Sequence, residues 1–124
     1  MNALWVFIGG GLGSLLRYGI SVAGWRLGWL QQGFPWATLL ANLLACGVMA
    51  SLLLWSPTQS STSTWRLLGM VGFCGGLSTF STFSLENYQL LQQGAWSALL
   101  LNILLNTLGC LLIFWGFHRI ITSA

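Results

Sequence analysis

The chain has 124 residues, of which 56% are hydrophobic and 4% are charged, and its formal net charge is +3. Charged residues are too few to cover the outside of a water-soluble domain, so this composition excludes a soluble protein. The chain is therefore predicted to lie in a membrane, surrounded by lipid.

Polar residues divide the chain into four apolar runs, each close to the roughly 20 residues that a membrane-spanning helix needs. The runs cover residues 3–23, 36–55, 65–88 and 95–117, and the polar stretch 56–64 is the clearest loop between them. All eight tryptophans lie near the ends of these runs, where an indole keeps its ring in hydrocarbon and its N–H among the headgroups. The sequence predicts an all-α integral membrane protein, with residues 1–124 forming a single domain of four transmembrane helices.

The first run contains several glycines and one arginine. It ends in Ser21-Val22-Ala23, which is similar to a signal-peptide cleavage site, but no positive charge precedes the run, which favours a retained helix. Gly9 and Gly13 are four residues apart and are expected to let a neighbouring helix approach closely. Arg17 either anchors the helix at the membrane interface or provides a positive charge that attracts anions to a pore mouth.

The second and fourth runs carry polar side chains at helical spacing. Each run has three residues spaced i, i+4 and i+8, which share one face of a helix: Thr38, Asn42 and Cys46 in the second run, and Asn102, Asn106 and Cys110 in the fourth. Polar groups inside a bilayer must find partners, so these stripes either hold helices together or line a polar path. The match between the two stripes favours the polar path. The cysteines have no metal-ligand spacing, which indicates small apolar filler.

The third run is interrupted by glycines and hydroxyl residues in the stretch GFCGGLSTFSTFSLEN, residues 72–87. Glycine weakens a helix, and Ser78 or Thr79 can cap a new one, so a break is predicted near Gly75–Ser78. Such a break frees backbone carbonyls that suit a small cation and N–H groups that suit an anion. The alternative is an unbroken, glycine-rich helix that packs closely against a neighbour.

Two phenylalanines follow the predicted break. Phe80 and Phe83 are three residues apart and share a helical face, while Ser81 and Thr82 provide hydroxyl donors beside them. An aromatic edge carries partial positive charge, so rings presented edge-on can attract an anion without holding it too tightly to conduct. The alternative is that the rings only fill a helix interface.

Glu86 is the only acidic residue in the chain. Its side chain could reach the membrane interface, act as a rotating hydrogen-bond partner in a pore, or carry protons. The only histidine, His118, lies at the C-terminal end of the last run, and no paired carboxylates or nucleophile–base arrangement is present. The sequence therefore does not predict an enzyme.

The arginines give little instruction about orientation in the membrane. With four spans, Arg66 and Arg119 lie on one side, and Arg26 lies on the other, joined by Arg17 if that residue reaches the interface. Such a near-balance lets a chain insert both ways up, and the natural assembly is then an antiparallel, dual-topology homodimer. The alternative is a single topology with a weak bias.

Three segments resemble the fluoride channel family known as Fluc or CrcB. The stretch from Gly72 to Phe83 is similar to the family signature in its third span, and the stretch from Gly9 to Tyr18, glycines followed by Arg-Tyr, is similar to its first motif. The segment Thr38–Asn42 resembles the motif of its second span. The resemblance covers three of the four spans in the same order.

The resemblance implies a bacterial inner-membrane channel that exports fluoride passively and relieves fluoride toxicity. It implies an antiparallel homodimer with two pores and a sodium ion at its centre, and no nucleic-acid partner. The sodium ligands would be the backbone carbonyls of Gly75 and Ser78. The fluoride path would involve Asn42, Phe80, Phe83, Ser81 and Thr82, with Arg17, Thr38, Glu86, Asn102 and Asn106 as accessory residues.

The chain departs from the family pattern in three places. Ser78 replaces the usual Thr, and Ala45 replaces a frequent Gly. Asn102 and Asn106 stand where the family commonly carries Tyr and Ser, so the contribution of the fourth span stays open. The alternative functions are a proton-coupled small multidrug exporter, for which an acid in the first span would be expected, and a structural membrane subunit.

Overall fold

The computed structural model describes residues 1–55 and 63–123, and every regular element in that part of the chain is a helix. The elements are α1 (Asn2–Arg26), η1 (Trp29–Gln32), α2 (Trp36–Trp55), η2 (Arg66–Cys74), α3 (Gly75–Leu77), α4 (Phe80–Gln92) and α5 (Trp96–Ser123). Four segments are long and apolar enough to cross a membrane: α1, α2, the η2–α3–α4 segment, and α5. The predicted all-α membrane fold is confirmed. The predicted loop at 56–64 lies almost wholly outside the described residues.

The first and last helices extend beyond the apolar runs that predict them. α1 continues to Arg26 rather than residue 23, and α5 continues to Ser123 rather than residue 117. At the end of α5 the Arg119 guanidinium lies 5.4 Å from the centroid of the Trp115 ring, and the Ser123 hydroxyl donates to the Arg119 carbonyl at 2.8 Å. Local contacts of this kind let a helix continue past the hydrocarbon into the polar interface.

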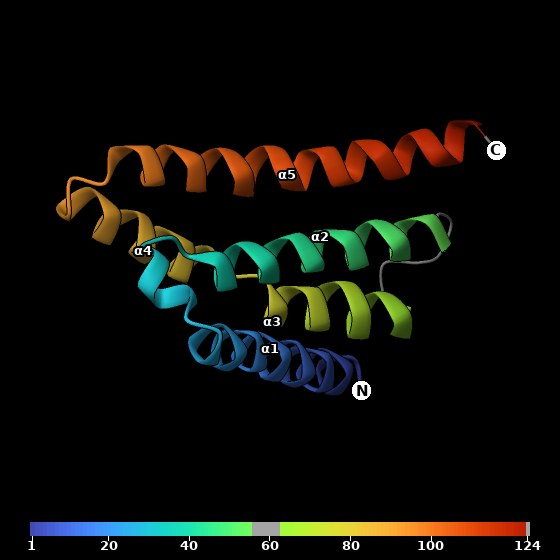
Figure 1. Ribbon diagram of the computed structural model, residues 1–124. Coiled ribbons are helices and arrows are strands. Elements are labelled where there is room, and N and C mark those ends of the chain that lie inside the picture. Colours follow the sequence, from blue (N-terminus) through green and yellow to red (C-terminus); the bar gives the residue numbers. More distant parts are fainter. Residues whose placement is uncertain (56–62, 124) are drawn as a thin grey trace.

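The long helices lie side by side in an order that differs from their order in the chain. In Figure 1, α1 lies at the bottom, η2 with α3 next, α2 above them and α5 at the top. α4 leaves this stack at the break and packs against α5, to which a turn at Gly94 (φ 69°) connects it. Both termini lie at the same end of the molecule, as an even number of spans requires.

The closest packing in the molecule joins α1 to the first half of the third span. A Cβ atom added to Gly13 would overlap the Phe73 carbonyl oxygen, and one added to Gly9 would overlap the Leu68 carbonyl oxygen. From the other side, a Cβ on Gly76 would overlap the Gly10 carbonyl oxygen. Backbone therefore lies directly on backbone, and the close helix contact predicted for Gly9 and Gly13 is confirmed.

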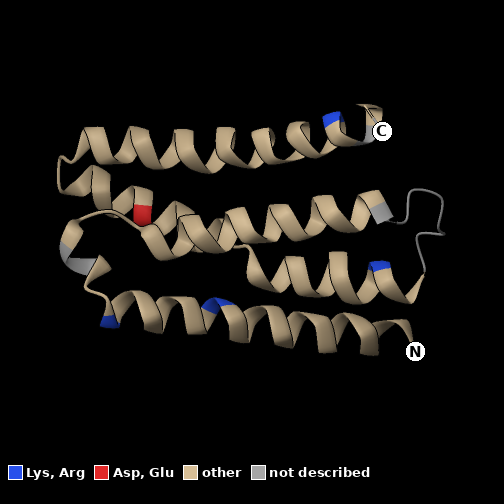
Figure 2. Cartoon of the chain, turned by 45° about the vertical axis from the view of Figure 1, so that its right-hand side comes forward, with Lys and Arg blue, Asp and Glu red and all other residues tan. Residues whose placement is uncertain are grey.

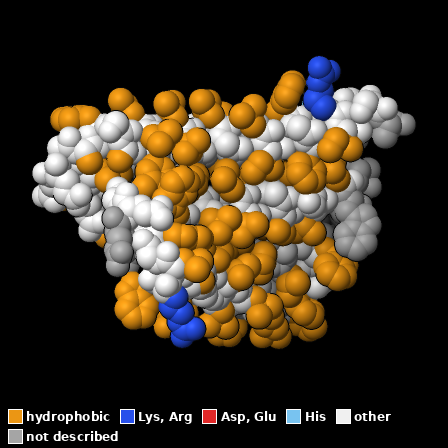
Figure 3. All heavy atoms as spheres, in the orientation of Figure 1, with side chains coloured by type: hydrophobic (Ala, Val, Ile, Leu, Met, Phe, Trp, Pro, Cys, Tyr) orange, Lys and Arg blue, Asp and Glu red, His pale blue; other side chains and the backbone are white. Residues whose placement is uncertain are grey.

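The outer surface of the helices suits lipid. Phe7 is 77% exposed and Leu15 is 67% exposed on α1, and Leu112 is 62% exposed on α5. Figure 3 shows hydrophobic side chains over most of one face of the molecule. Figure 2 shows basic residues near both ends of the long helices and one further along α1. The chain is a multi-pass membrane protein.

Candidate functional site

The third span is broken at Ser78 and Thr79, at the C-terminal end of the predicted region Gly75–Ser78, whereas Gly75 and Gly76 remain helical. α3 ends at Leu77, and the backbone is extended at Ser78 (φ −74°, ψ 153°) and Thr79 (φ −149°, ψ 117°) before α4 begins at Phe80. The Thr79 hydroxyl caps α4 by accepting a hydrogen bond from the backbone N–H of Thr82 at 3.2 Å. Of the two candidate caps in the sequence, the structure thus uses Thr79.

The break diverts two backbone N–H groups from their helical partners. In a continuous helix the Thr79 N–H would donate to the Gly75 carbonyl, and the Thr82 N–H to the Ser78 carbonyl. Instead, Thr79 N–H donates to Asn42 Oδ1 at 2.9 Å, and Thr82 N–H donates to the Thr79 hydroxyl. The carbonyls of Gly75 and Ser78 therefore lose their helical donors.

The Asn42 side chain is oriented by the break. A backbone N–H can only donate, so the Asn42 atom that faces Thr79 must be the carbonyl oxygen Oδ1. The amide nitrogen Nδ2 then points the other way, where it donates to Asn106 Oδ1 at 2.8 Å. One of the two amide hydrogens of Asn42 is used in this bond, and the other is available for a ligand.

Three more asparagines follow Asn42 in a chain of hydrogen bonds, in which each amide nitrogen donates to the carbonyl oxygen of the next residue. Asn106 Nδ2 donates to the backbone carbonyl and to Oδ1 of Asn102, at 3.0 and 2.8 Å. Asn102 Nδ2 donates to Asn87 Oδ1 at 2.9 Å. Asn102 is 0% and Asn106 is 7% exposed, so these amides depend on one another for hydrogen bonds. We call Asn42, Asn106, Asn102 and Asn87 the amide chain.

Asn87 was not predicted as a site residue. The signal that could have identified it is its position beside Glu86 in an otherwise apolar span, since any such amide needs a partner in the bilayer. The amide chain links α2, α5 and α4 to the break, and so joins the two polar stripes that the spacing predicts.

Glu86 points to the second span. Thr38, which is 6% exposed, donates its hydroxyl to Glu86 Oε1 at 2.6 Å. The other carboxyl oxygen, Oε2, is buried and has no hydrogen-bond partner among the described residues. Thr38 and Glu86 therefore form a polar contact between α2 and α4, one helical turn from Asn42.

The two phenylalanines lie together at the start of α4. Their ring centroids are 5.8 Å apart and the ring planes are inclined by 43°. Phe80 is 79% exposed, whereas Phe83 is half-buried. Beside them the Thr79 hydroxyl donates to the Thr82 hydroxyl at 3.0 Å and lies 3.3 Å from the Ser81 hydroxyl. Ring edges and hydroxyls thus share the beginning of this helix.

These elements enclose a groove of about 280 Å³, open on one side of the chain. We call it the polar groove after the asparagine, serine and threonine residues in its lining, although most of its exposed lining surface is apolar. It is lined by Asn42 and Cys46 of α2, by Ser78, Thr79, Phe80 and Phe83 of the third span, and by Asn106, Thr107 and Cys110 of α5. The groove therefore brings together Asn42, both phenylalanines and Asn106, all of which the sequence singles out.

Other predicted site residues lie outside the polar groove. Ser81 and Thr82 lie on α4 beside it, and Asn102 lies behind its wall in the amide chain. Arg17 is half-exposed on α1 and does not line the groove. Cys46 and Cys110, predicted as filler, do line it. With amide hydrogens, hydroxyls and ring edges, the groove can bind a small anion that accepts hydrogen bonds.

Comparisons with known proteins agree with the sequence motifs. Residues 4–117 match the family model described as "CrcB-like protein, Camphor Resistance (CrcB)". Relatives named "Fluoride-specific ion channel FluC" include one from Serratia proteamaculans, 45% identical over 111 residues that cover 89% of this chain and 85% of the relative. Others are from Klebsiella pneumoniae, 44% identical over 119 residues (92% and 91%), and Magnetococcus marinus, 42% identical over 113 residues (90% of each).

Proposed function

Because the chain belongs to the CrcB-like family, we propose that it is a fluoride-selective channel that lets fluoride leave the bacterial cell passively across the inner membrane. The observation that carries this proposal is the polar groove, in which an oriented amide and two aromatic rings meet at a helix break. The names of relatives that are 42–45% identical over most of the chain supply the ion.

Fluoride would meet its donors in the polar groove. The donor would be the second amide hydrogen of Asn42, since Thr79 N–H holds the Asn42 carbonyl and Asn106 accepts the first hydrogen. A small, strongly accepting anion gains most from a fixed donor, because the donor need not reorganise as the ion arrives. The edges of Phe80 and Phe83 would then hold the ion weakly enough to release it.

Selectivity for fluoride over chloride would follow from the short distances between the hydrogen-bond donors that meet the ion. Donors fixed by buried hydrogen bonds cannot move apart to make room for a larger ion without breaking those bonds. Ser81 and Thr82 would add hydroxyl donors along α4, and Arg17 would attract anions at the mouth of the path. Thr38 and Glu86 would extend the polar surface by one helical turn along α2.

The channel is proposed to be an antiparallel homodimer, because one chain leaves the site incomplete. Phe80 is 79% exposed, and the polar groove has no wall on its open side. Each end of the helices carries arginine in near-balance, which favours insertion both ways up. A second copy related by a two-fold axis in the membrane plane would then close each groove and give two pores.

Sodium is proposed to bind where two breaks meet at the dimer axis. The carbonyls of Gly75 and Ser78 have lost their helical donors, since the N–H groups of Thr79 and Thr82 donate elsewhere. Backbone carbonyls without donors are hard oxygen ligands of the kind that small cations prefer, so the residues present fit the ion. Bound there, sodium would supply positive charge that holds the two chains together.

Dual topology predicts that reporters fused to the C-terminus will be found on both sides of the membrane. A reporter that is active only in the cytoplasm and one that is active only in the periplasm, each fused to the C-terminus, should both give signal, because arginines do not bias the chain. Adding two lysines after Ser123 should shift the signal towards the cytoplasmic reporter. Signal from one side alone for the unmodified chain would contradict dual topology.

Phe80→Ile and Phe83→Ile are each expected to lower fluoride flux by roughly tenfold, because an aliphatic side chain has no positive edge to attract the ion. The size-exclusion profile of each purified variant should match that of the unmodified protein. Leu85→Ile, at an exposed position on the same helix, is the control and should leave flux unchanged. Unchanged flux in both phenylalanine variants would show that the rings only fill a helix interface and do not take part in conduction.

Passive conduction is tested by releasing fluoride from liposomes that contain the purified protein, with and without an imposed proton gradient. Efflux should proceed at the same rate in both cases when the electrical potential is clamped. The buried Glu86 oxygen that has no hydrogen-bond partner among the described residues favours the second candidate, a proton-coupled exporter. Efflux that requires the gradient, and that Glu86→Gln abolishes, would support that candidate instead.

A further inference from the structure

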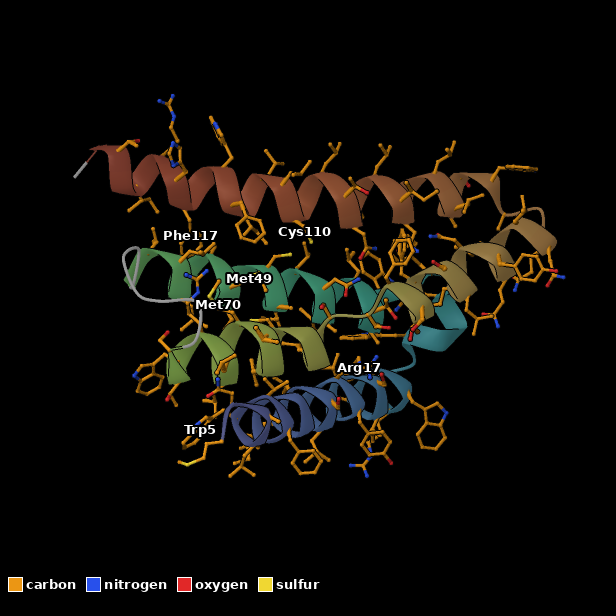
Figure 4. All side chains as sticks on the ribbon, turned by 180° about the vertical axis from the view of Figure 1, so that it is seen from behind. Trp5, Arg17, Met49, Met70, Cys110 and Phe117 are labelled. Carbon is orange, nitrogen blue, oxygen red and sulfur yellow. The ribbon has the colours of Figure 1, made fainter. Side chains whose placement is uncertain are left out.

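Two cysteines meet in the wall of the polar groove. Cys46 of α2 and Cys110 of α5 both line it, and Cys46 stands one helical turn after Asn42 on the same face of α2. The Cys110 thiol also lies 3.8 Å from the backbone carbonyl of Asn42. Figure 4 shows Cys110 on the side of α5 that faces α2. Both cysteines are free thiols and are only half-buried.

We propose that Cys46 and Cys110 form a binding site for a soft, two-coordinate metal cation such as Cu(I) or Ag(I). Thiolate sulfur is the protein ligand that soft cations prefer over imidazole or carboxylate. The part of the chain that the structure describes contains no group of three or more His, Cys, Asp or Glu side chains near one another, so the two thiols have no third side-chain ligand of these types. Two thiols from facing helices suit a cation that takes two ligands.

The binding step changes the charge of the groove wall. Each thiol loses its proton to water and forms one sulfur–metal bond, so two protons leave and one monovalent cation arrives. The neutral thiol pair therefore becomes a bis-thiolate complex with a net charge of −1. This charge develops beside Asn42, the residue whose amide is proposed to meet fluoride.

A soft metal should therefore block the channel, an effect that rests on the proposed function. A negative charge within a few ångströms of the path repels an anion strongly where water is scarce. The bound cation also fixes the distance between α2 and α5 at the level of the polar groove. Metal binding itself, in contrast, does not depend on whether the chain conducts fluoride.

The third cysteine provides a matched control. Cys74 lies on η2, is 1% exposed and does not line the polar groove. Alanine in its place removes one of the three thiols while leaving the pair intact. Cys46→Ala and Cys110→Ala each remove one ligand of the pair, so the three variants differ only in which thiol is lost.

The experiment uses silver nitrate as the probe, in chloride-free buffer, on the purified full-length protein. After desalting in an excess of a competing monothiol, the unmodified protein and Cys74→Ala should each retain about one silver ion per chain, and Cys46→Ala and Cys110→Ala, each left with a single thiol at the site, should lose it. Fluoride efflux from liposomes should fall by at least about tenfold on addition of silver in the first two proteins and stay unchanged in the other two.

The two readouts separate the possible failures. Equal silver retention in Cys46→Ala or Cys110→Ala, with size-exclusion profiles like that of the unmodified protein, would overturn the site. Retention that depends on the pair, without any loss of fluoride efflux, would overturn the block. If silver binds as expected but the untreated protein conducts no fluoride, the proposed function fails and the metal site stands.

Discussion

Asn106→Leu is expected to lower fluoride flux by about ten- to a hundredfold, because an orphaned buried polar group costs about 1–3 kcal/mol. The substitution removes the acceptor that fixes the Asn42 amide and the donor that satisfies Asn102. Without Asn106, only the Thr79 N–H holds the Asn42 amide, so its hydrogens are less firmly directed into the polar groove. The measurement is fluoride efflux from liposomes, with chloride efflux recorded in parallel.

The ratio of fluoride to chloride flux shows whether Asn106→Leu acts by freeing the Asn42 amide or only by destabilising the folded channel. If Asn106→Leu only reduced the number of folded channels, fluoride and chloride flux would fall together and their ratio would not change. A freed Asn42 amide should instead lower the ratio of fluoride to chloride flux. The drop in the ratio of fluoride to chloride flux should be largest for Asn106→Leu, smaller for Asn102→Leu and smallest for Asn87→Leu. Each of these positions lies one hydrogen bond further from Asn42 along the amide chain. An unchanged ratio in all three variants would contradict an orienting role.

Gly13→Ala is expected to lower the thermal midpoint of the purified protein by roughly 5 °C or more, because overpacking a tight contact typically costs about 1–3 kcal/mol. The added methyl group would overlap the Phe73 carbonyl oxygen, which is backbone and cannot rotate away. α1 would have to separate from η2 along its length. The midpoint is read from the fraction that remains monodisperse on size exclusion after heating.

Gly11→Ala is the matched control on the same helix. A Cβ atom at Gly11 meets nothing within 4 Å, so this variant changes the intrinsic preference for helix without any overlap. Its thermal midpoint should equal or exceed that of the unmodified protein. Equal loss of stability in both variants would show that glycine matters here for flexibility rather than for close approach.

Much of the fold follows from features that can be read along the chain. Run length predicts the four spans, because a helix must be about 20 residues long to cross the hydrocarbon. The hydroxyl cap predicts the break, and Thr79 caps α4 as its residue type and position indicate. The glycines before it are helical, and Gly72 and Gly76 allow close contact with α1 instead. The boundaries of α1 and α5 are less predictable, since hydropathy does not show how far a helix continues into the interface.

The form of η2 is not predictable from its residues. Arg66–Cys74 adopts a π-helix that packs against α1 and α2. π-helices are rare, and no pattern in these residues distinguishes one from an α-helix. The same holds for the pairing of the polar stripes. Spacing places Asn42 and Asn106 each on one face of a helix, but only the packing of α2 on α5 joins them.

The contacts of Asn87 and of the cysteine pair could not be predicted from the sequence. Asn87 has no stripe of its own, and its role appears only when α4 packs against α5. Cys46 and Cys110 are 64 residues apart, and spacing places each on its own polar stripe without showing that the two line one groove. Long-range contacts between helices decide both cases, and sequence spacing within one helix cannot reveal them.

Selective fluoride conduction is tested most directly by recording fluoride and chloride efflux from the same liposomes, loaded with both ions and containing the purified protein. The potential is clamped with potassium and valinomycin, and protein-free liposomes measure the leak. Rapid fluoride efflux with chloride efflux no faster than the leak is the predicted result. Chloride efflux at a rate comparable to that of fluoride, or fluoride efflux no faster than from protein-free liposomes, would contradict the account.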